Sequence, residues 1–413
     1  MFSAEPDHAG VDSDPDSSLS VDAAQVNSVV RRDAALLEDD LRAFLKSLTA
    51  APDDGSADGS AAVCATALHR SLHRSLYTPV SDALGSKVGQ QALPPSAGAP
   101  GGTAPLRPSM VYWAYRNYRG FPEGPGSEEA SADLAVVRRA AVAVRVLLKA
   151  AVVLDDIQDG SAMRYGEPAL HITHGVPVAL NTGSWLITAA LRHAADPGVV
   201  DSLIRGVGHG FTGQALDLAT RSADTRADLL AAPHEERVRF WESVAARKTG
   251  TLFRMPLDAA LAALGVVEEE RHALDGAMRR LGLASQLFND LTDVVPELGG
   301  AKTHEDFDGL GNRVFLELLD SPPRPPRPPR PSDPDGLTGA RLKSYVLGHP
   351  RLRDTLLDLS AQAVEWKRSA KEAVRGVCRS ARSAAYFDVT IERKGHLIDR
   401  LHETLRQRSG ATG

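Results

Sequence analysis

The sequence is poor in cysteine and in aromatic residues. Only Cys64 and Cys378 occur in 413 residues, and their wide separation gives neither a disulfide framework nor a zinc-ligand spacing. Such low cysteine usage fits a reducing compartment. Aromatic residues make up only 5% of the chain, whereas Ala, Leu and Arg are abundant. Because these three residues lose little free energy on entering a helix, the composition favours an all-α fold.

The sequence also lacks a strong charge of one sign and a long apolar run. Its formal net charge of −6 is modest for this length and gives no sign of a nucleic-acid partner. The N-terminus, MFSAEPDHAG, has acidic residues where a signal peptide needs a basic stretch followed by an apolar run. No later segment approaches an uncharged membrane span. We therefore expect a cytoplasmic protein with no membrane span and no nucleic-acid partner.

Composition divides the chain into four parts. Residues 1–25 are rich in Asp, Ser and Pro, which predicts a disordered acidic tail. Residues 26–320 are expected to form a helical domain. Residues 321–336 form a Pro/Arg-rich loop, because each proline removes a backbone donor and interrupts a helix. The P-x-x-P spacing of this loop also suits a ligand for a polyproline reader, although a spacer is the simpler interpretation. Residues 337–413 are expected to be helices that pack on the same domain.

Apolar residues recur at helical spacing through most of the chain. The pattern predicts helices at Val29 to Leu48, Ala61 to Leu84, Ala132 to Asp159, Pro177 to Ala195, Val199 to Arg221, Glu236 to Leu264, Val267 to Val295, Gly339 to Leu347 and Leu352 to Arg408. The last of these must be either broken or very long. Strand-like alternation with hairpin signals is absent. Helices of this number and length can form one large bundle.

The segment VLLKAAVVLDDIQD is apolar until it ends in three carboxylates. The spacing i to i+4 places Asp155 and Asp159 on one helical face, with Asp156 beside them. Carboxylates at the C-terminal end of a helix oppose its macrodipole, so a compensating cation is expected. Magnesium prefers carboxylate oxygens and shares its remaining positions with water and substrate phosphate. The pattern therefore favours a magnesium site, with a solvated acidic helix end as the alternative.

A second acidic segment, SQLFNDLTD, also follows apolar helical turns. It places Asn289 and Asp293 one turn apart, with Asp290 adjacent. Two such helix ends facing each other would clamp a diphosphate. Arg164 and Lys248 are then candidates to contact its oxygens, since metal ions and fixed cations together stabilise the charge on a leaving diphosphate. For Lys248 alone, a surface lysine whose stem lies along apolar surface is the alternative.

Taken in order, these segments resemble the motifs of the trans-isoprenyl diphosphate synthase (polyprenyl synthetase) family, from about Gly101 to Arg313. DDIQDGSAMRYGEPALH resembles the family's first aspartate-rich motif with its following arginines, and GQALDL resembles its Gly-Gln helix. KTGTLF carries Lys248 and Thr249, and SQLFNDLTD resembles the second aspartate-rich segment with Asn289 in place of its first aspartate. The resemblance implies a single large helical bundle of the isoprenoid synthase (class I terpenoid synthase) type.

The resemblance also implies roles for individual residues. Three Mg²⁺ ions would be held by the two acidic segments, through Asp155, Asp156, Asp159, Asn289, Asp290 and Asp293. The diphosphate of an allylic isoprenoid substrate would be bound by Arg164, Lys248, Thr249, Gln286, Lys302 and Arg107. The residues that act in catalysis would be Asp155, Asp156, Asp159, Arg164 and Lys248. The family resemblance is also compatible with a homodimer.

The departures from the family pattern fall in one place. Chain-elongating members bind isopentenyl diphosphate through a Gly-Lys-Arg-x-Arg-Pro segment, a histidine before the first motif and a second arginine after it. Here that segment reads GGTAPLRP, so Ala104 and Pro105 replace two cations and Arg107 remains. Leu148 stands at the histidine position, and Tyr165 at that of the second arginine. Each lost charge-assisted contact costs about 1.5 to 3 kcal/mol, so we expect weak binding of isopentenyl diphosphate.

An enzyme that ionises an allylic diphosphate but cannot hold a second substrate makes a carbocation that is quenched internally, by proton loss or by water. We therefore expect a class I terpene synthase. Asn289, Asp293 and Glu297 resemble the Asn-Ser/Thr-Glu metal triad of such enzymes, although Pro296 should disturb the helix before Glu297. Two alternatives stay open. One is a prenyltransferase that still elongates chains, and the other is a non-catalytic regulatory subunit of a synthase.

The expected substrate length rests on two small residues. Ala150 and Ala151 lie one turn before the first motif, where short-chain members of the family tend to carry bulky aromatics. They favour a deep pocket and a C20 substrate such as geranylgeranyl diphosphate. Aromatic residues that could face a carbocation, with ordinary core packing as the alternative for each, are Trp113, Tyr115, Trp185 and Phe288.

Overall fold

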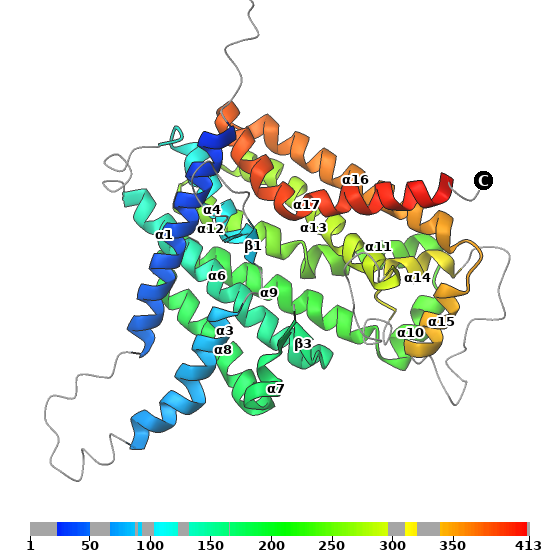
Figure 1. Ribbon diagram of the computed structural model, residues 1–413, viewed down its shortest axis with the longest axis horizontal. Coiled ribbons are helices and arrows are strands. Elements are labelled where there is room, and N and C mark those ends of the chain that lie inside the picture. The colour runs from blue at the N-terminus through cyan, green and yellow to red at the C-terminus, as the bar shows by residue number, and fades with distance from the viewer. Residues whose placement is uncertain are drawn as a thin grey trace, which may run out of the picture.

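The computed structural model describes residues 23–49, 67–86, 90–92, 103–122, 132–164, 166–295, 310–319 and 339–410. Over these ranges the chain is a bundle of helices, as Figure 1 shows, so the prediction of an all-α fold is confirmed. The Pro/Arg-rich loop and residues 1–22 of the predicted tail lie outside these ranges. Residues 23–25, which were assigned to the tail, are already helical.

The elements in chain order are helices with two short strand pairs between them. The helices are α1 (Ala23–Thr49), a π-helical turn η1 (His73–Tyr77), α3 (Thr78–Gly85), α4 (Leu106–Tyr118), α6 (Ala132–Asp159), α7 (Leu170–His174), α8 (Val176–Ala194), α9 (Pro197–Ala219), α10 (Ala223–Ala231), α11 (His234–Lys248), α12 (Thr251–Ala263), α13 (Glu268–Val294), α14 (Arg313–Leu318), α15 (Gly339–Leu347), α16 (Leu352–Val377) and α17 (Ala381–Gly410). The strands β1 (Gln90–Ala92) and β2 (Thr103–Pro105) pair antiparallel, as do β3 (Met163–Arg164) and β4 (Glu167–Pro168).

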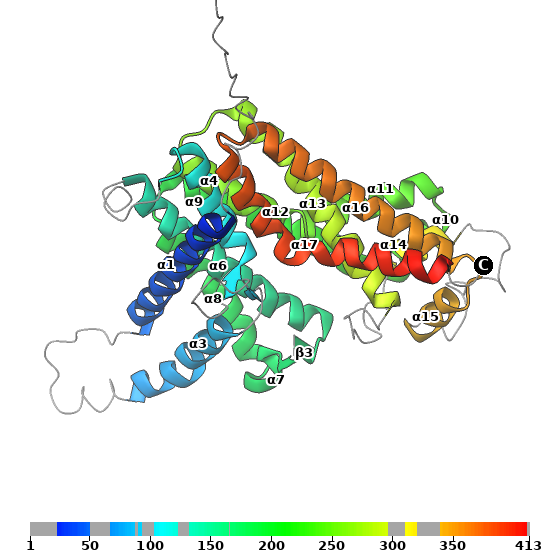
Figure 2. The same cartoon turned by 45° about the horizontal axis from the view of Figure 1, so that its top comes forward.

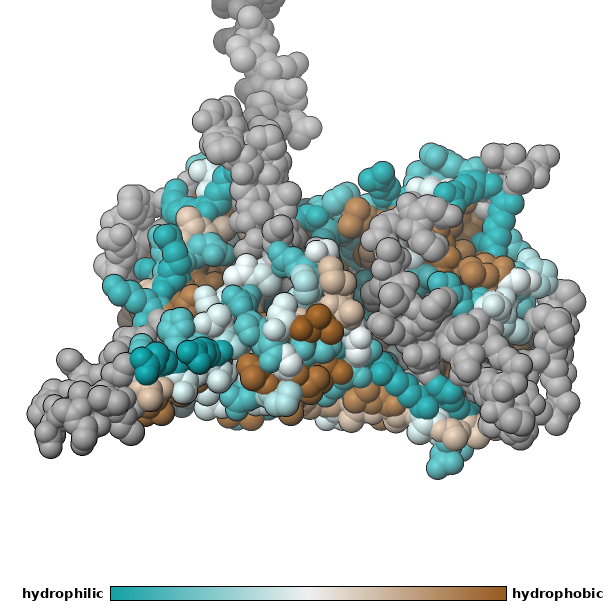
Figure 3. Space-filling model, turned by 60° about the horizontal axis from the view of Figure 1, so that its bottom comes forward, coloured by the Kyte–Doolittle hydropathy of each residue, from teal (hydrophilic) through white to brown (hydrophobic). Residues whose placement is uncertain are grey.

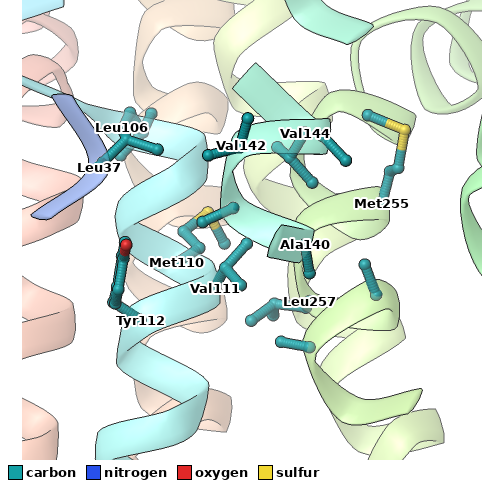
Figure 4. Close-up of a cluster of buried hydrophobic side chains, with 14 of the residues drawn as sticks. Leu37, Leu106, Met110, Val111, Tyr112, Ala140, Val142, Val144, Met255 and Leu257 are labelled. Carbon is teal, nitrogen blue, oxygen red and sulfur yellow. The ribbon is translucent and has the colours of Figure 1, made fainter. Parts of the chain in front are cut away.

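Helix α4 lies at the centre of one end of the bundle. Almost every residue of α4 is buried, from Leu106 to Asn117, because α6, α12 and α17 all pack against it. Figure 4 shows Met110 and Val111 of α4 beside Ala140 of α6 and Leu257 of α12. A helix that is buried on every side shows no apolar stripe. This explains why the helical spacing of apolar residues gave no prediction for α4.

The remaining long helices pack in pairs around this centre. Helix α6 packs along α8, α9 packs against α11 and α12, and α13 packs along α16. Helices α16 and α17 form a long hairpin over α13, which Figures 1 and 2 show along one edge of the molecule. The pairing brings the C-terminal ends of α6, α9, α11 and α13 into one region.

Two of the predicted helices are interrupted. The helix expected at Glu236 to Leu264 divides into α11 and α12 at Thr249 and Gly250, where α13 crosses closely. A Cβ atom on Gly282 of α13 would overlap the backbone of Gly250. The segment expected at Leu352 to Arg408 is broken into α16 and α17 at residues 378–380.

A buried ion pair fastens α1, α4 and α17 together. Arg116 of α4 pairs with Asp33 of α1, and both side chains are almost fully buried. The hydroxyl of Tyr386, on α17, donates a hydrogen bond of 2.8 Å to Asp33. The C-terminal hairpin is therefore tied to the N-terminal helix through polar contacts as well as apolar packing.

Among the helices that the structure describes, none is both long enough and apolar enough to cross a membrane.

Candidate functional site

The first aspartate-rich motif occupies the last turn of α6. The helix ends where Gly160 adopts a positive φ of 68°, a conformation that favours glycine. The chain then turns through β3 and β4, so that Arg164 lies back over the helix end. Its guanidinium donates to Asp156 Oδ1 (2.7 Å) and to Asp155 Oδ2 (2.9 Å). Arg164 therefore supplies one of the compensating cations that the macrodipole argument requires.

Two more cations reach the same helix end from α11 and from the residues after α9. Lys248, the last residue of α11, lies 3.3 Å from Asp155 Oδ1 and donates to Asp217 Oδ2 at 2.6 Å. Arg221 donates to Asp159 Oδ1 at 2.8 Å and to the carbonyl of Gln158 at 3.1 Å. The three acids of α6 and Asp217 of α9 thus form one ion-pair cluster with these cations.

Burial and neighbouring charges together set the pKa values of the acids in this cluster. Burial alone would raise the pKa of Asp155, but the nearby Lys248 and Arg164 outweigh it and lower that pKa below its usual value. For Asp159, burial and the neighbouring carboxylates of Asp155 and Asp217 raise the pKa. Burial likewise raises the pKa of Asp156, despite its bond to Arg164. A cluster that holds several carboxylates this close together stabilises any added cation.

Lys248 itself is firmly charged. Burial alone would lower its pKa, but the carboxylates of Asp155, Asp217 and Asp159 outweigh that effect and raise the pKa well above the usual lysine value. About a quarter of its side chain is exposed. Lys248 is therefore a fixed positive charge that also reaches solvent, and its two ion pairs distinguish it from a surface lysine whose stem only lies along apolar surface.

The second acidic segment lies in the last two turns of α13 and has different partners. Asp290 is 3% exposed and accepts hydrogen bonds from Trp241 Nε1, Gln286 Nε2 and the backbone N–H of Arg313, each at 2.8 Å. Asp293 is also buried, whereas Asn289 is half-buried. Thr249 donates to Gln286 Oε1 at 2.6 Å. These contacts tie α13 to the end of α11 and to α14.

The donor set suits magnesium, although the acids do not converge as they stand. The carboxylates of Asp155, Asp159 and Asp217 offer the oxygen ligands that Mg²⁺ prefers. Over the described part of the chain, however, no three acidic, histidine or cysteine side chains surround a single point closely enough to hold a metal ion. Arg164, Lys248 and Arg221 hold the carboxylates instead. Metal binding at this cluster stays a prediction, and it requires these cations to move from the carboxylates onto a bound anion.

A small cavity marks the place where the helices meet. It has a volume of about 40 Å³ and is lined by Asp217, Trp241, Val244, Ala245, Lys248, Gln286 and Gly311. Sites for organic ligands usually measure about 300 Å³ or more. This cavity is much smaller than that. Its lining brings Lys248 and Asp217 of the ion-pair cluster beside Trp241 and Gln286.

The residues that depart from the family pattern lie around the start of α4 and on α6. Ala104 is fully buried, and Pro105 immediately precedes α4. Leu148 is half-buried against the apolar core. The guanidinium of Arg107 lies over the ring of Phe253, 5.1 Å from its centroid. Three further predicted residues, Tyr165, Glu297 and Lys302, lie outside the described ranges.

The aromatic and small residues proposed for the pocket divide into core and non-core positions. Trp113 packs against Phe387 and donates its indole N–H to the carbonyl of Ser383, and Tyr115 is buried in the same core. Both are core residues, so the alternative of ordinary packing holds for them. Trp185 and Phe288 are half-buried. Ala150 is fully buried in the core, whereas Ala151 is exposed.

Three residues of the site, Asp217, Arg221 and Trp241, were not predicted from the sequence. Asp217 is part of the GQALDL segment, and its spacing from Gln214 gave a signal that could have been used. Arg221 and Trp241 gave no local signal, because their partners Asp159 and Asp290 belong to distant helices. Only the packing of the helices identifies them.

Comparison with known proteins assigns the chain to a family. The family model described as polyprenyl synthetase matches residues 99–307, about half of the chain. Geranylfarnesyl diphosphate synthase of Natronomonas pharaonis is 29% identical over 187 residues, which cover 43% of this chain and 50% of that protein. Variediene synthase of Aspergillus brasiliensis is 29% identical over 168 residues, which cover 40% of this chain and 23% of that protein. The chain therefore spans half or less of the length of these two relatives.

Solved structures share the fold over almost the whole chain. A polyprenyl synthase from Caulobacter crescentus, in complex with calcium and isoprenyl diphosphate, has a TM-score of 0.58 and 19% identity, covering 92% of this chain and 98% of that one. A geranylgeranyl pyrophosphate synthetase from Geoglobus acetivorans has a TM-score of 0.57 and 18% identity, covering 91% of this chain and 99% of that one. The matched family model, together with the aspartate-rich helix ends, shows that the chain belongs to the polyprenyl synthetase family.

Proposed function

We propose that this protein ionises an allylic polyprenyl diphosphate in a magnesium-dependent reaction, releases diphosphate and converts the carbocation to a terpene. The observation that carries the proposal is the ion-pair cluster at the end of α6. There, Asp155 is bound by two cations, Arg164 and Lys248, that come from different elements. Carboxylates and cations of this kind can exchange partners when a metal diphosphate binds. A C20 substrate is favoured by the small residues Ala150 and Ala151.

The acids of the cluster would bind the metal, and its cations would bind the diphosphate. Asp155, Asp156, Asp159 and Asp217 would hold the metal, which when bound neutralises the charge on the leaving diphosphate. Arg164 and Lys248 would donate to the phosphate oxygens, and their contribution grows as negative charge develops during ionisation. Asn289 and Asp293 of α13 are the proposed ligands on the opposite side.

The proposal of cyclisation over elongation rests on the start of α4. Elongation needs a second diphosphate site, and the buried Ala104 and the half-buried Leu148 offer no donor for one. The guanidinium of Arg107 is engaged over the ring of Phe253. A carbocation formed without a bound second substrate is quenched within its own chain, by proton loss or by water.

One observation favours elongation as the second candidate. Arg393 of α17 donates to the carbonyl of Ala104 (3.3 Å) and to the hydroxyl of Ser109 (3.4 Å), so a guanidinium lies beside the segment that lost its cations. Burial lowers the pKa of Arg393 to about 10. In the described part of the chain its hydrogen-bond acceptors are uncharged oxygens. A partly desolvated guanidinium of this kind is suited to binding a second diphosphate.

One assay separates these candidates. The purified protein is incubated with Mg²⁺ and geranyl, farnesyl or geranylgeranyl diphosphate, each with and without isopentenyl diphosphate. Hydrocarbon formed without isopentenyl diphosphate supports the proposal. A longer diphosphate that forms only with isopentenyl diphosphate, and that is lost in Arg393→Gln, supports elongation and overturns it. The absence of any turnover, together with binding to a second synthase, would favour the regulatory subunit.

We further propose that the protein forms a homodimer through α7, α8 and α9. Of the nine large apolar side chains that are exposed in the described ranges, five lie on these helices, namely Ile172, Val176, Leu180, Ile204 and Phe211. Figure 3 shows brown apolar residues gathered on the side of the molecule that carries these helices. Exposed apolar surface of this kind is typical of an association site. A symmetric dimer would cover the same surface on both copies.

A further inference from the structure

We infer that Asp290 is a positioning residue, which fixes the direction of a hydrogen-bond relay that ends at Thr249, and that it is not a metal ligand. The inference rests on the proposed function, because it concerns the end of the site where α11 would meet the diphosphate. It replaces the expectation from sequence, in which both Asp290 and Thr249 contact the bound metal diphosphate directly.

Both carboxylate oxygens of Asp290 already accept hydrogen bonds in the protein interior. Gln286 Nε2 donates to Oδ1, while Trp241 Nε1 and the backbone N–H of Arg313 donate to Oδ2, each at 2.8 Å. The side-chain amide of Asn312 also donates to the backbone carbonyl of Asp290 at 3.1 Å. Three helices therefore hold this carboxylate in place, and one of its donors is a backbone group that cannot rotate away.

The direction of the relay follows from the chemistry of the groups. Gln286 turns its Nε2 amide, which can only donate, toward Asp290 Oδ1. Its Oε1 oxygen then faces Thr249 Oγ1 at 2.6 Å, and a carbonyl oxygen can only accept. The Thr249 hydroxyl must therefore donate its single proton to Gln286. It has no proton left for a phosphate oxygen, which leaves the donor role to Lys248 and Arg164.

The packing around Trp241 resists any movement of Asp290 toward a metal ion. The indole ring of Trp241 stacks on Trp366 of α16 with centroids 6.4 Å apart and planes inclined by 12°. The guanidinium of Arg313 lies 5.4 Å from the same ring and also pairs with Glu317. If Asp290 turned away, the buried indole N–H and the backbone N–H of Arg313 would lose their acceptor.

The acids of the ion-pair cluster differ from Asp290 in this respect. Asp155 is bound by the side chains of Arg164 and Lys248, and Asp217 by that of Lys248; about a quarter of each of these two cationic side chains is exposed. These long side chains can turn onto a phosphate without unfolding a helix. A metal ion can therefore take the oxygens of Asp155 and Asp217 at low cost. Asp290 is only 3% exposed and its Oδ2 already accepts two hydrogen bonds, so a metal ion can reach its oxygens only by opening the junction of α11, α13 and α14.

Substitution of Asp290 by Asn gives a direct test, because it preserves shape and reverses the relay. The Asn oxygen can stay with Trp241 and Arg313, while its amide donates to a flipped Gln286. Gln286 then donates to Thr249, whose proton becomes available to a phosphate. The binding of inorganic diphosphate and of Mg²⁺ is measured by calorimetry for the wild type, Asp290→Asn and, as the matched ligand control, Asp155→Asn.

We expect Asp155→Asn to raise the half-saturating Mg²⁺ concentration at least about tenfold and Asp290→Asn to raise it less than about twofold. Thr249→Val should raise the Kd of diphosphate at least about fivefold in the Asp290→Asn background and less than about threefold in the wild type. An increase in half-saturating Mg²⁺ for Asp290→Asn as large as that for Asp155→Asn would overturn the inference. An equal effect of Thr249→Val in both backgrounds would do the same.

A measurement on the unsubstituted protein does not depend on how the variants fold. The indole N–H resonance of Trp241, identified by its loss in Trp241→Phe, should keep its position when Mg²⁺ and inorganic diphosphate are added. A large shift together with faster hydrogen exchange would mean that Asp290 has left the indole to bind metal. Absence of the proposed magnesium diphosphate site would look different, since the wild type would then bind no magnesium diphosphate. In that case the Trp241 resonance would still report, by its response to Asp290→Asn, whether the carboxylate holds the indole.

Discussion

Substitution of Asp217 by Asn tests whether the site depends on a contact between α9 and α11. The change keeps the shape of the side chain and removes the charge that faces Lys248. In the folded protein Lys248 Nζ lies 2.6 Å from Asp217 Oδ2 and 3.3 Å from Asp155 Oδ1. Without the first of these contacts, Lys248 is held by Asp155 alone, and the cluster also loses one candidate oxygen ligand for magnesium.

The expected loss can be worked out from the two roles proposed for Asp217. In the resting site it positions Lys248 Nζ, and once Lys248 has turned onto the phosphate its carboxylate would face the metal. A hydrogen bond that involves charged groups contributes about 1.5 to 3 kcal/mol. The Asp217 side chain is 26% exposed, so water partly replaces the lost bond and the lower half of that range applies. Since about 1.4 kcal/mol corresponds to a factor of ten in rate, we expect kcat/KM to fall about 10- to 50-fold.

The assay measures diphosphate release from an allylic substrate under saturating Mg²⁺, with thermal unfolding recorded alongside. Asp201→Asn is the matched control, because Asp201 lies on the same helix and pairs with Arg205 at the surface, where both side chains are more than half exposed. Such a surface pair contributes about 0 to 1 kcal/mol. If Asp217→Asn keeps kcat/KM within about twofold of the wild type, the proposed role of Asp217 at the site is refuted. A fall in kcat/KM that only tracks a loss of folded protein would refute it as well.

Three further predictions concern stability, pH dependence and assembly. Asp33→Asn should lower the free energy of unfolding in urea by about 3 to 5 kcal/mol, because it removes the charge that Asp33 presents to the buried Arg116. The control is Asp133→Asn, whose pair with Arg119 is partly exposed and which should lower the free energy of unfolding by about 0 to 1 kcal/mol. Equal losses in the two variants would contradict the prediction. Burial lowers the pKa of Lys149 to about 7, whereas the pKa of a lysine in the unfolded chain is about 10.4. Between about pH 7 and about pH 10.4 the unfolded state therefore binds more protons than the folded state, and the free energy of unfolding should rise with pH. The urea midpoint should therefore increase more from pH 7 to 9 in the wild type than in Lys149→Met, and equal increases would show that Lys149 is not the cause. Phe211→Asp should shift the protein from dimer to monomer in light scattering. Arg205→Asp, at an exposed polar position on the same helix, should leave the dimer intact. A wild type that is already monomeric would exclude the proposed interface.

The sequence predicted the elements that depend on local periodicity. Helices α6, α8, α9 and α13 agree with the predicted ranges within a few residues, because the apolar stripe of each follows the 3.6-residue repeat. The grouping of Asp155, Asp156 and Asp159 at one helix end follows from the same repeat. Local spacing was less useful where packing overrides it, as in the buried helix α4 and at the break beside Gly250.

Tertiary structure decided the partners of each functional side chain. The sequence identified Lys248 and Asp290 as candidates, but only the packing of α9 against α11 showed that Asp217 holds Lys248. In the same way, only the junction of α11, α13 and α14 showed that Trp241 and the Arg313 backbone hold Asp290.

The physical reason for this division is the range over which each kind of information acts. Helical spacing is set by backbone geometry over one or two turns, so the sequence by itself determined that acidic groups gather at the ends of α6 and α13. Which cation or donor meets each acid depends on how helices far apart in the chain pack together, as α6 and α11 do at Asp155 and Lys248. The sequence thus determined the chemical groups of the site, and the tertiary structure decided which carboxylates can still exchange partners and which are held in place.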